Sequence, residues 1–299
     1  IKQEESELKE MKLQLFTNIS HEIRTPLTLV MSPLKKMRES EQDPQQKNLY
    51  NLMYRNSLRI LRLVNQLLDM RKVDNGQMKL HFLETDVIYF IKDIMQSFDN
   101  LAVSRHINFH IESEDEVTNL WIDQGNFDKI IFNVLSNAFK HTPDNGEIAI
   151  KVSSPRTNAG DLDASIKEYV EFHIENSGSS IEEKHLDKIF DRFYQVDIKD
   201  AKVGSGVGLH LTKLLTDLHH GKISAYNTET GIAFRIIIPV GCSHLNAEEM
   251  TKPENHKDLY TKMPAIAEEH NSNNEDLTYD SNAGKNTAVK NAKARKKII

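Results

Sequence analysis

The 299-residue sequence predicts an α+β multidomain protein, in which an antiparallel helical hairpin is followed by a two-layer α/β sandwich. Apolar residues recur every three or four positions over residues 8–70, which is typical of helices. After Asn75-Gly76, short β-rich runs alternate with helix-like stretches. The length also exceeds the roughly 100 to 200 residues that one hydrophobic core serves. We therefore expect a hairpin over residues 1–75, an α/β domain over 76–241, and a disordered tail or linker over 242–299.

Composition and charge exclude several classes of protein. Charged residues make up 27% and hydrophobic residues 38% of the chain, and the net charge is -6. A chain of this kind has no broad basic face, so we expect no direct nucleic-acid partner. The single cysteine, Cys242, cannot form an intramolecular disulfide and favours a reducing, cytoplasmic compartment. No stretch approaches the roughly 20 apolar residues that cross a bilayer, so we expect any membrane anchor to lie outside this chain.

Two apolar stripes predict the helical hairpin. The first stripe comprises Phe16, Ile19, Ile23, Leu27, Val30, Leu34 and Met37, and the second Leu49, Met53, Asn56, Ile60, Leu63, Leu67 and Met70. The second alternates steps of four and three, the period of a left-handed coiled coil. A short polar connection, Glu39–Gln46, contains the helix breaker Pro44. Because a lone hairpin buries too little, we expect a homodimeric four-helix bundle; half of a monomeric bundle is the alternative.

The remaining elements predict one sheet with helices on one face. The expected strands are Lys79–Leu83, Ile107–Ile111, Ile148–Val152, Tyr169–Ile174, Ile223–Tyr226 and Ala233–Ile238, and the expected helices are Asp86–Val103, Asp123–Phe139, Glu182–Phe190 and Gly208–His219. The aperiodic segment Ser153–Lys167 is interpreted as a loop insertion. The chain ends in Lys296-Lys297-Ile298-Ile299, which could begin the first strand of a further domain.

A histidine on the predicted wet face of the first helix is a candidate nucleophile. His21 lies two positions from both Ile19 and Ile23, so it faces away from the buried stripe. A lone exposed histidine is usually an ordinary surface residue. Here Glu22 can orient the ring and accept a proton, and Pro26 should kink or loosen the next turn. Packing alone does not explain this combination.

The segment Ser20-His-Glu-Ile-Arg-Thr-Pro-Leu27 resembles the phospho-acceptor box of the sensor histidine kinases, within the dimerisation and phosphotransfer domain called HisKA. The resemblance implies that His21 is phosphorylated and that Glu22 acts as the general base. It also implies that Thr25 positions water when the same domain dephosphorylates its partner.

Asparagines and a lysine share one face of the predicted helix Asp123–Phe139. Asn133, Asn137 and Lys140 are spaced four and three apart; a solvated polar face is the ordinary explanation, but they could also supply neutral oxygens to a cation and charge to phosphate. The run from Asn133 through His141 is similar to the N box of the histidine kinases and of the Hsp90, MutL and gyrase ATPases, the GHKL or Bergerat fold. That resemblance implies Asn137 as an Mg²⁺ ligand, Asn133 and Lys140 near the phosphates of ATP, and His141 near the base.

A second box resembles the adenine-binding DxGxGI motif of the same family but departs from it. Asn176 stands at the acidic position, and Gly178 is followed by Ser180 where the second glycine is expected. An asparagine oxygen can still accept a hydrogen bond from the adenine amino group, but without charge assistance. We therefore expect weaker nucleotide binding, with loss of ATP binding as the alternative.

A glycine-rich run before the last predicted helix resembles the family's phosphate-binding G2 box. It contains Gly204, Gly206, Gly208 and Leu209, and glycines let the backbone approach phosphate at a helix start. Upstream, Phe190-Asp-Arg192-Phe-Tyr194 resembles the family's F box, which implies Arg192 near the γ-phosphate. The segment Gln195–Val203 between them is expected to be a mobile lid.

Taken together, the resemblance covers residues 8–240 and implies ATP- and Mg²⁺-dependent autophosphorylation of His21. A receiver-domain aspartate of a response regulator would then take the phosphoryl group, and the same domain would have phosphatase activity. The wording around His21 and the polar tail also resemble hybrid kinases, whose receiver lies in the same chain, and the family implies the cytoplasmic part of an inner-membrane sensor. Two alternatives remain: a pseudokinase scaffold with a degraded ATP site, and a conformational ATPase like Hsp90 and MutL.

Overall fold

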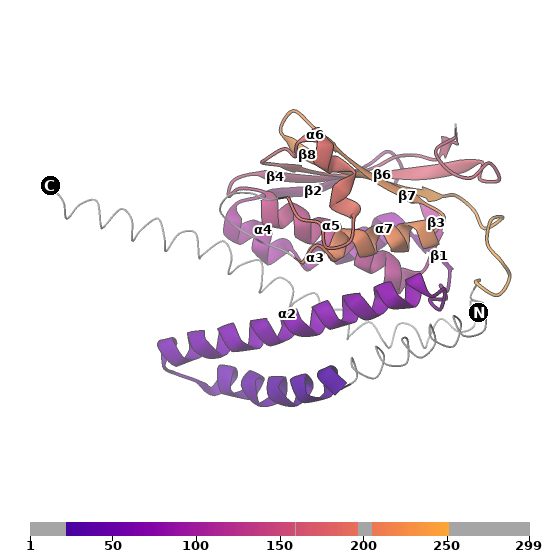
Figure 1. Ribbon diagram of the computed structural model, residues 1–299. Coiled ribbons are helices and arrows are strands. Elements are labelled where there is room, and N and C mark those ends of the chain that lie inside the picture. The colour runs from indigo at the N-terminus through magenta and orange to yellow at the C-terminus, as the bar shows by residue number, and fades with distance from the viewer. Residues whose placement is uncertain (1–21, 159, 197–204, 251–299) are drawn as a thin grey trace. The chain divides into compact units, whose positions relative to one another are not determined.

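The computed structural model describes residues 22–158, 160–196 and 205–250. The chain forms two compact units (Figure 1). Among the described residues, one unit comprises residues 22–79, 192–196 and 205–211, and the other comprises residues 80–158, 160–191 and 212–250. Each unit is described by itself below.

The first unit contains the predicted hairpin. Residues 22–40 are helical, residues 41–43 connect, and helix α2 spans Pro44–Asp74. Two contacts establish the antiparallel pairing: Arg24 Nη2 donates to Asn65 Oδ1 at 2.8 Å, and the Arg38 guanidinium lies 4.6 Å from the centre of the Tyr54 ring. The partner residues run in opposite directions along the two helices, as an antiparallel hairpin requires.

The connection between the two helices is shorter than the sequence suggested. Asp43 is the N-cap of α2, and its side chain accepts a hydrogen bond from the backbone N–H of Gln45. Pro44 occupies the first turn of α2, where its missing N–H costs no hydrogen bond. Pro44 therefore begins the helix and does not interrupt the connection. At Pro26, which was expected to kink or loosen the helix, the helix of residues 22–40 continues without a break.

The second unit is built on a six-stranded sheet. Its strands are β2 Asn108–Ser113, β4 Glu147–Val152, β5 Arg156–Thr157, β6 Glu168–Ser177, β7 Lys222–Asn227 and β8 Gly231–Pro239. Their order is β2-β4-β6-β8-β7, with β5 pairing to β6. Only β2 and β4 run parallel; the other pairs are antiparallel. A separate antiparallel pair joins β1 Leu83–Asp86 to β3 Asn119–Ile122.

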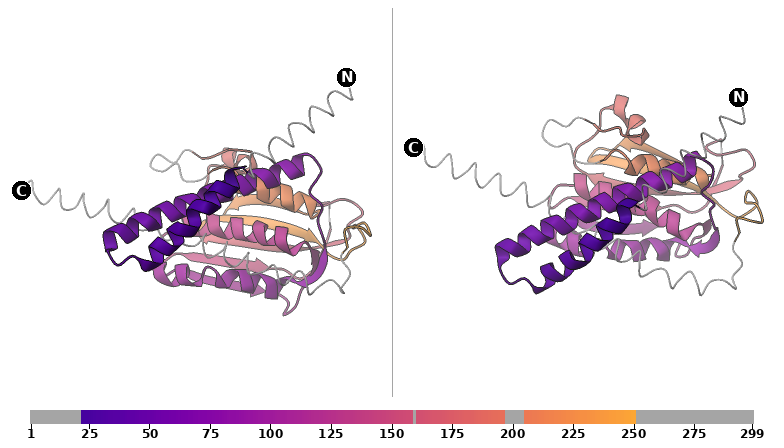
Figure 2. Two further views of the ribbon diagram at one scale, coloured as in Figure 1. Left: turned by 90° about the horizontal axis from the view of Figure 1, so that it is seen from below. Right: turned by 60° about the horizontal axis from the view of Figure 1, so that its bottom comes forward.

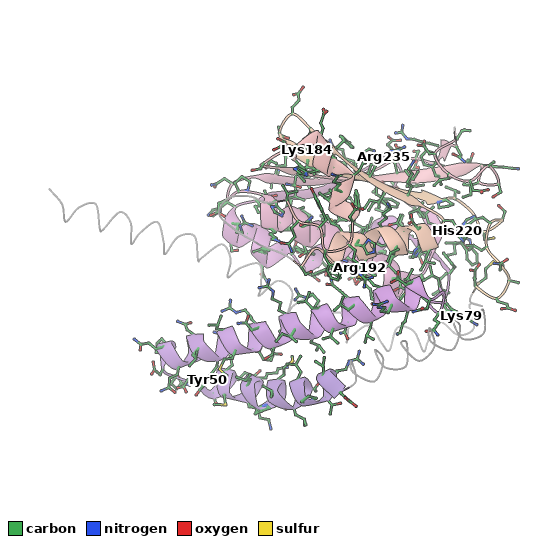
Figure 3. The ribbon with its side chains drawn as sticks, in the orientation of Figure 1. Tyr50, Lys79, Lys184, Arg192, His220 and Arg235 are labelled. Carbon is green, nitrogen blue, oxygen red and sulfur yellow. The ribbon has the colours of Figure 1, made fainter. Side chains whose placement is uncertain are left out.

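Helices cover one face of this sheet (Figure 2). They are α3 Val87–Gln96, α4 Asp99–Arg105, α5 Gln124–His141 and α7 Gly208–Leu218. Along β6 the side chains of Val170, Phe172 and Ile174 point to the helices and have no exposed surface. The intervening polar residues face away; Arg235 of β8, labelled in Figure 3, pairs there with Glu171. The predicted two-layer sandwich is therefore confirmed.

Several elements differ from the sequence-based prediction. The first strand lies at Leu83–Asp86, four residues later than expected at its start, and β3 was not predicted. The expected helix Asp86–Val103 is divided into α3 and α4 around Phe98, and the expected helix Glu182–Phe190 into α6 Glu183–Leu186 and the 3₁₀ helix η1 Lys188–Phe190. A four-residue strand such as β3 is too short for its alternation to stand out.

The expected insertion and the start of the expected tail both have order. Asn158 organises the insertion, because its side chain donates to the carbonyls of Leu162, Asp163 and Ile166. At the other end of the domain, Phe82 N–H donates to the carbonyl of Glu249 at 2.8 Å. Within the described ranges, no helix is both long enough and apolar enough to cross a membrane.

Candidate nucleotide and phospho-acceptor sites

Helix α5 carries the predicted N box, and its start is fixed by one carboxylate. Asp123 is the N-cap, as predicted: its Oδ1 accepts from Asn126 N–H at 2.9 Å. Its Oδ2 accepts from His81 N–H at 2.8 Å. The ring of His219 completes the cluster, because its Nε2 accepts from the backbone N–H of Asp123 at 3.2 Å. The beginning of the N-box helix is thus tied to two distant segments.

His219 is a buried, neutral imidazole. Only 1% of it is exposed, and its Nδ1 donates to the carbonyl of Leu215 at 2.7 Å. Since Nε2 accepts from Asp123, the proton must lie on Nδ1. Burial lowers the pKa of His219 below its ordinary value of 6.5, although the Leu215 carbonyl and the Asp123 carboxylate act in the opposite direction. The uncharged ring is therefore part of the packed structure.

The two faces of α5 are divided as the sequence predicts. The core face is Phe127, Ile130, Ile131, Val134 and Ala138, all of which have no exposed surface. On the other face, Asn133 Nδ2 donates to Thr212 Oγ1 of α7 at 3.4 Å. Asn137 is half-buried, and its side chain makes no hydrogen bond to any residue of the described ranges. An unsatisfied, half-buried amide on a helix face is a group that a ligand could complete.

The end of α5 brings Lys140 and His141 next to the second box. Lys140 is half-buried, and Gly178 lies so close that a Cβ there would be 2.7 Å from the carbonyl oxygen of His141. Gly178 also has φ of 136°, which favours glycine. Desolvation by the surrounding protein atoms, and then the charge of Lys140, lower the pKa of His141 to about 4, although the residue keeps an exposed edge. The His141 ring is therefore neutral at pH 7.

Asn176 lies beside this turn at the end of β6. It is 1% exposed, and its Nδ2 donates to the carbonyl of Ser177 at 3.2 Å. No residue in the described part of the chain donates to its Oδ1. Gly231 of β8 packs against it, because a Cβ there would be 2.0 Å from the Asn176 carbonyl oxygen. The side chain therefore keeps an available acceptor, as the resemblance to the adenine-binding box requires.

Arg192, Phe193 and Tyr194 of the F box and the described G2-box residues belong to the first unit, whereas Phe190 and Asp191 belong to the second. Phe193 N–H donates to the carbonyl of Gly206 at 2.9 Å, and both residues have positive φ. A Cβ at Gly206 would be 2.6 Å from the Phe193 backbone, so glycine is required there. Arg192 Nη1 lies 3.6 Å from Asp74 Oδ2, and its Nε is buried without a hydrogen-bond partner among the described residues.

The remaining predicted residues of this segment divide between described and undescribed ranges. Gly208 is the first residue of α7, and Leu209 follows it. Gly204 and most of the predicted lid, Gln195–Val203, lie outside the described residues. The same holds for His21, the predicted phospho-acceptor. Of its predicted helpers, Glu22 and Thr25 are on the helix of residues 22–40 and both are exposed.

The donors present suit a hard cation held mainly by its substrate. No group of three or more His, Cys, Asp or Glu side chains within the described ranges could hold a metal by itself. Mg²⁺ is usually bound through few protein oxygens together with phosphates and waters. The available carboxamide of Asn137 fits that requirement.

Comparison with known proteins identifies two domains in the chain. Residues 11–76 match the model of the His Kinase A (phospho-acceptor) domain, and residues 122–241 match the model of the histidine kinase-, DNA gyrase B- and HSP90-like ATPase. The chain therefore belongs to the histidine kinases and carries their catalytic core, a phospho-acceptor domain followed by an ATP-binding domain. The resemblance inferred from the sequence is confirmed.

Relatives and solved structures support the same assignment. Histidine kinase P4 of Formosa agariphila is 35% identical over 256 residues, 83% of this chain but 18% of that protein. The chain thus spans about a fifth of the length of the curated relatives it matches. Full-length ShkA in complex with AMPPNP has a TM-score of 0.62 at 20% identity, covering 76% of this chain and 45% of that one. The complex of histidine kinase ThkA with response regulator protein TrrA has a TM-score of 0.51 at 24% identity, covering 80% and 66%. These two structures show the fold alone.

Sequence reasoning missed residues that act through distant contacts. Thr212 partners Asn133 and is completely buried, and Gly231 packs against the backbone carbonyl of Asn176. Arg105 was not considered at all. Nothing near Thr212 or Arg105 in the sequence indicates their partners.

Proposed function

We propose that this chain phosphorylates itself on His21 with ATP and passes the phosphoryl group to an aspartate of a receiver domain. The observation that carries the proposal is the presence, in one chain, of a phospho-acceptor domain and an ATPase domain. In the ATPase domain, the side-chain amide of Asn137 makes no hydrogen bond to the described residues. The exposed positions of Glu22 and Thr25 support it, since groups that act at a phospho-accepting histidine must be accessible.

The residues divide the chemistry among them. A neutral imidazole nitrogen of His21 attacks the γ-phosphorus in line, the bond to the ADP oxygen breaks, and Glu22 takes the imidazole proton. Lys140 offsets the charge on the phosphoryl group, with Arg192, Gly204, Gly206, Gly208 and Leu209 assigned to the phosphates. Asn137 would hold Mg²⁺, which neutralises charge between the phosphates. Asn176, Gly178 and His141 would hold the adenine.

The hairpin supports a homodimer as the working form. Several apolar residues of the two predicted stripes remain more than one-third exposed in the single chain. They are Ile23, Val30 and Met37 of the first stripe and Leu49, Met53, Ile60 and Leu67 of the second. Contiguous apolar surface of this kind is unusual on a monomer and marks an interaction site. A second copy packing stripe to stripe into a four-helix bundle would bury it.

The partners and setting follow from the same assignment. A response regulator would receive the phosphoryl group, and Thr25 would position the water when the domain acts as a phosphatase. A receiver in the same full-length chain fits the polar segment beyond residue 241. The single, half-buried Cys242 supports a reducing compartment, so we propose that the core works in the cytoplasm as part of an inner-membrane sensor.

Labelled ATP tests the proposal directly. Incubation with Mg²⁺ and ATP labelled on the γ-phosphate should give an acid-labile phosphoprotein, and His21→Gln should abolish the label while nucleotide still binds. Glu22→Gln should slow labelling without weakening nucleotide binding. Steady hydrolysis without a phosphoprotein would favour a conformational ATPase instead. Absence of nucleotide binding at millimolar ATP would favour a pseudokinase scaffold. This outcome is tested because Asn176 replaces the acidic residue of the adenine-binding box.

A further inference from the structure

Arg105 reaches from a neighbouring helix to the end of the N-box helix. It is the last residue of α4, and His106 after it has φ of 54°, which ends the helix. Its side chain is only 11% exposed. A long cationic side chain is rarely buried to this extent unless it has partners.

The guanidinium of Arg105 uses all three of its nitrogens at one place. Nη1 donates to the carbonyl of Phe139 and Nη2 to the carbonyl of Thr142, each at 2.5 Å. Nε donates to Asp144 Oδ1 at 3.0 Å. The backbone adds a further link, because Asn145 N–H donates to the Arg105 carbonyl at 2.9 Å. This planar fork of donors is specific to arginine, and a lysine cannot reproduce it.

The contacts enclose the residues assigned to the nucleotide. Lys140 and His141 lie between the two carbonyls that Arg105 holds, and the His141 carbonyl in turn packs against Gly178. The last carbonyls of a helix lack intrahelical partners and carry partial negative charge, so a buried cation stabilises this turn. The geometry of the turn Phe139–Thr142 therefore depends on Arg105, which contacts the backbone of this turn and belongs to a different helix.

We propose that Arg105 is a positioning residue of the nucleotide site: it holds the turn Phe139–Thr142 so that Lys140, His141 and Gly178 keep the places that bind ATP. The inference rests on the proposed function. Arg105 acts through the backbone of the turn and is assigned no contact with the nucleotide.

Two variants and a matched control test this role in the 299-residue chain. Arg105→Met keeps the apolar length but removes all the donors, and Arg105→Lys keeps the charge without the fork. The control is Arg156→Met, which removes a half-exposed guanidinium and its ion pairs with Glu114 and Glu171 elsewhere in the same unit. The dissociation constant of a fluorescent ATP analogue with Mg²⁺ should rise about tenfold for Arg105→Met and less for Arg105→Lys. Losing a hydrogen bond to a charged group typically costs enough free energy to raise a dissociation constant by about this factor. The control should change little.

Hydrogen exchange separates positioning from general instability. In Arg105→Met without nucleotide, amides of residues 140–146 should exchange faster, while those of β8 stay protected. The Lys variant should restore part of both the protection and the affinity. Unchanged affinity in Arg105→Met, or faster exchange across the whole domain, would overturn the inference. If the unchanged chain bound no nucleotide, both the proposed function and the positioning role would fail. If the unchanged chain bound nucleotide but the amides of residues 140–146 exchanged at the same rate in Arg105→Met, only the positioning role would fail.

Discussion

The hairpin and the ATPase domain bury their apolar residues to very different degrees. Within α2 only Ser57 and Met70 are buried, and apolar residues such as Leu49 remain 53% exposed. In the ATPase domain, aromatic residues such as Phe127 and Phe172 have no exposed surface. The ATPase domain therefore has a complete hydrophobic core of its own, whereas the hairpin leaves much of its apolar surface uncovered. The ATPase domain should therefore be stable by itself, and the hairpin should depend on association.

The largest expected effect is the loss of a core aromatic from the ATPase domain. Phe127 lies with its ring centre 5.7 Å from that of Phe172, and Phe127→Ala should cost about 3–5 kcal/mol of unfolding free energy through lost burial and a cavity. Urea denaturation of the chain measures it. Tyr89→Ala, at a residue that is 73% exposed, is the control and should change stability by less than about 0.5 kcal/mol. A small loss at Phe127 would mean that this core is less complete than it looks.

A charge in the hairpin stripe should affect association more than folding. Ile60 is 48% exposed in the single chain, and Ile60→Asp should raise the dimer dissociation constant at least about 100-fold, because a carboxylate would be buried in the bundle. Light scattering at several concentrations detects the shift to monomer. Leu29→Asp adds the same charge at a residue that is 70% exposed and outside the stripe, so the dimer should persist. Equal effects of the two changes would remove the stripe as the interface.

Acid should weaken the ATPase domain before it affects the exposed hairpin. Because burial lowers the pKa of His219 below 6.5, the folded domain binds fewer protons than the unfolded chain once the pH falls below 6.5. Unfolding free energy should then fall by up to about 1.4 kcal/mol per pH unit from this group. Urea titrations between pH 7.5 and 5 measure the slope, which His219→Asn should reduce. The same change at His185 of α6 should leave it intact; a slope independent of His219 would refute the assignment.

The smallest expected effect concerns the neutral residue in the adenine-binding box. Asn176→Asp should strengthen ATP binding about fivefold near pH 8, since a carboxylate accepts the adenine amino hydrogen bond roughly 1 kcal/mol better than an amide. Titration calorimetry with Mg²⁺ and a non-hydrolysable ATP analogue detects this change. Asn100→Asp, at an exposed position near the start of helix α4, adds the same charge as a control. Weaker binding in Asn176→Asp would show that Asn176 is adapted to its buried site.

The sequence predicted the parts of the fold that depend on local pattern. The stripes through Ile23 and Leu49 and the core face of α5 were found because helical spacing is visible in the residues themselves. The prediction was weaker where elements are short: β3 was missed, and the boundaries around α6 were inaccurate. The candidate site was predicted by motif, and the structure brings Asn133, Lys140, His141, Asn176 and Gly178 into one unit.

By itself, then, the sequence determined the order of the domains, the helical periods and the candidate reactive and nucleotide-binding side chains, because these depend on neighbours within a few turns. Only the tertiary structure decided the strand order β2-β4-β6-β8-β7, the hydrogen bond from Asp123 N–H to His219, and the hydrogen bond from Arg105 to the carbonyl of Phe139. Their partners lie 96 and 34 positions apart in the chain. Hydrogen bonds between such distant residues leave no periodic trace in the sequence, so they follow only from how the sheet and helices pack.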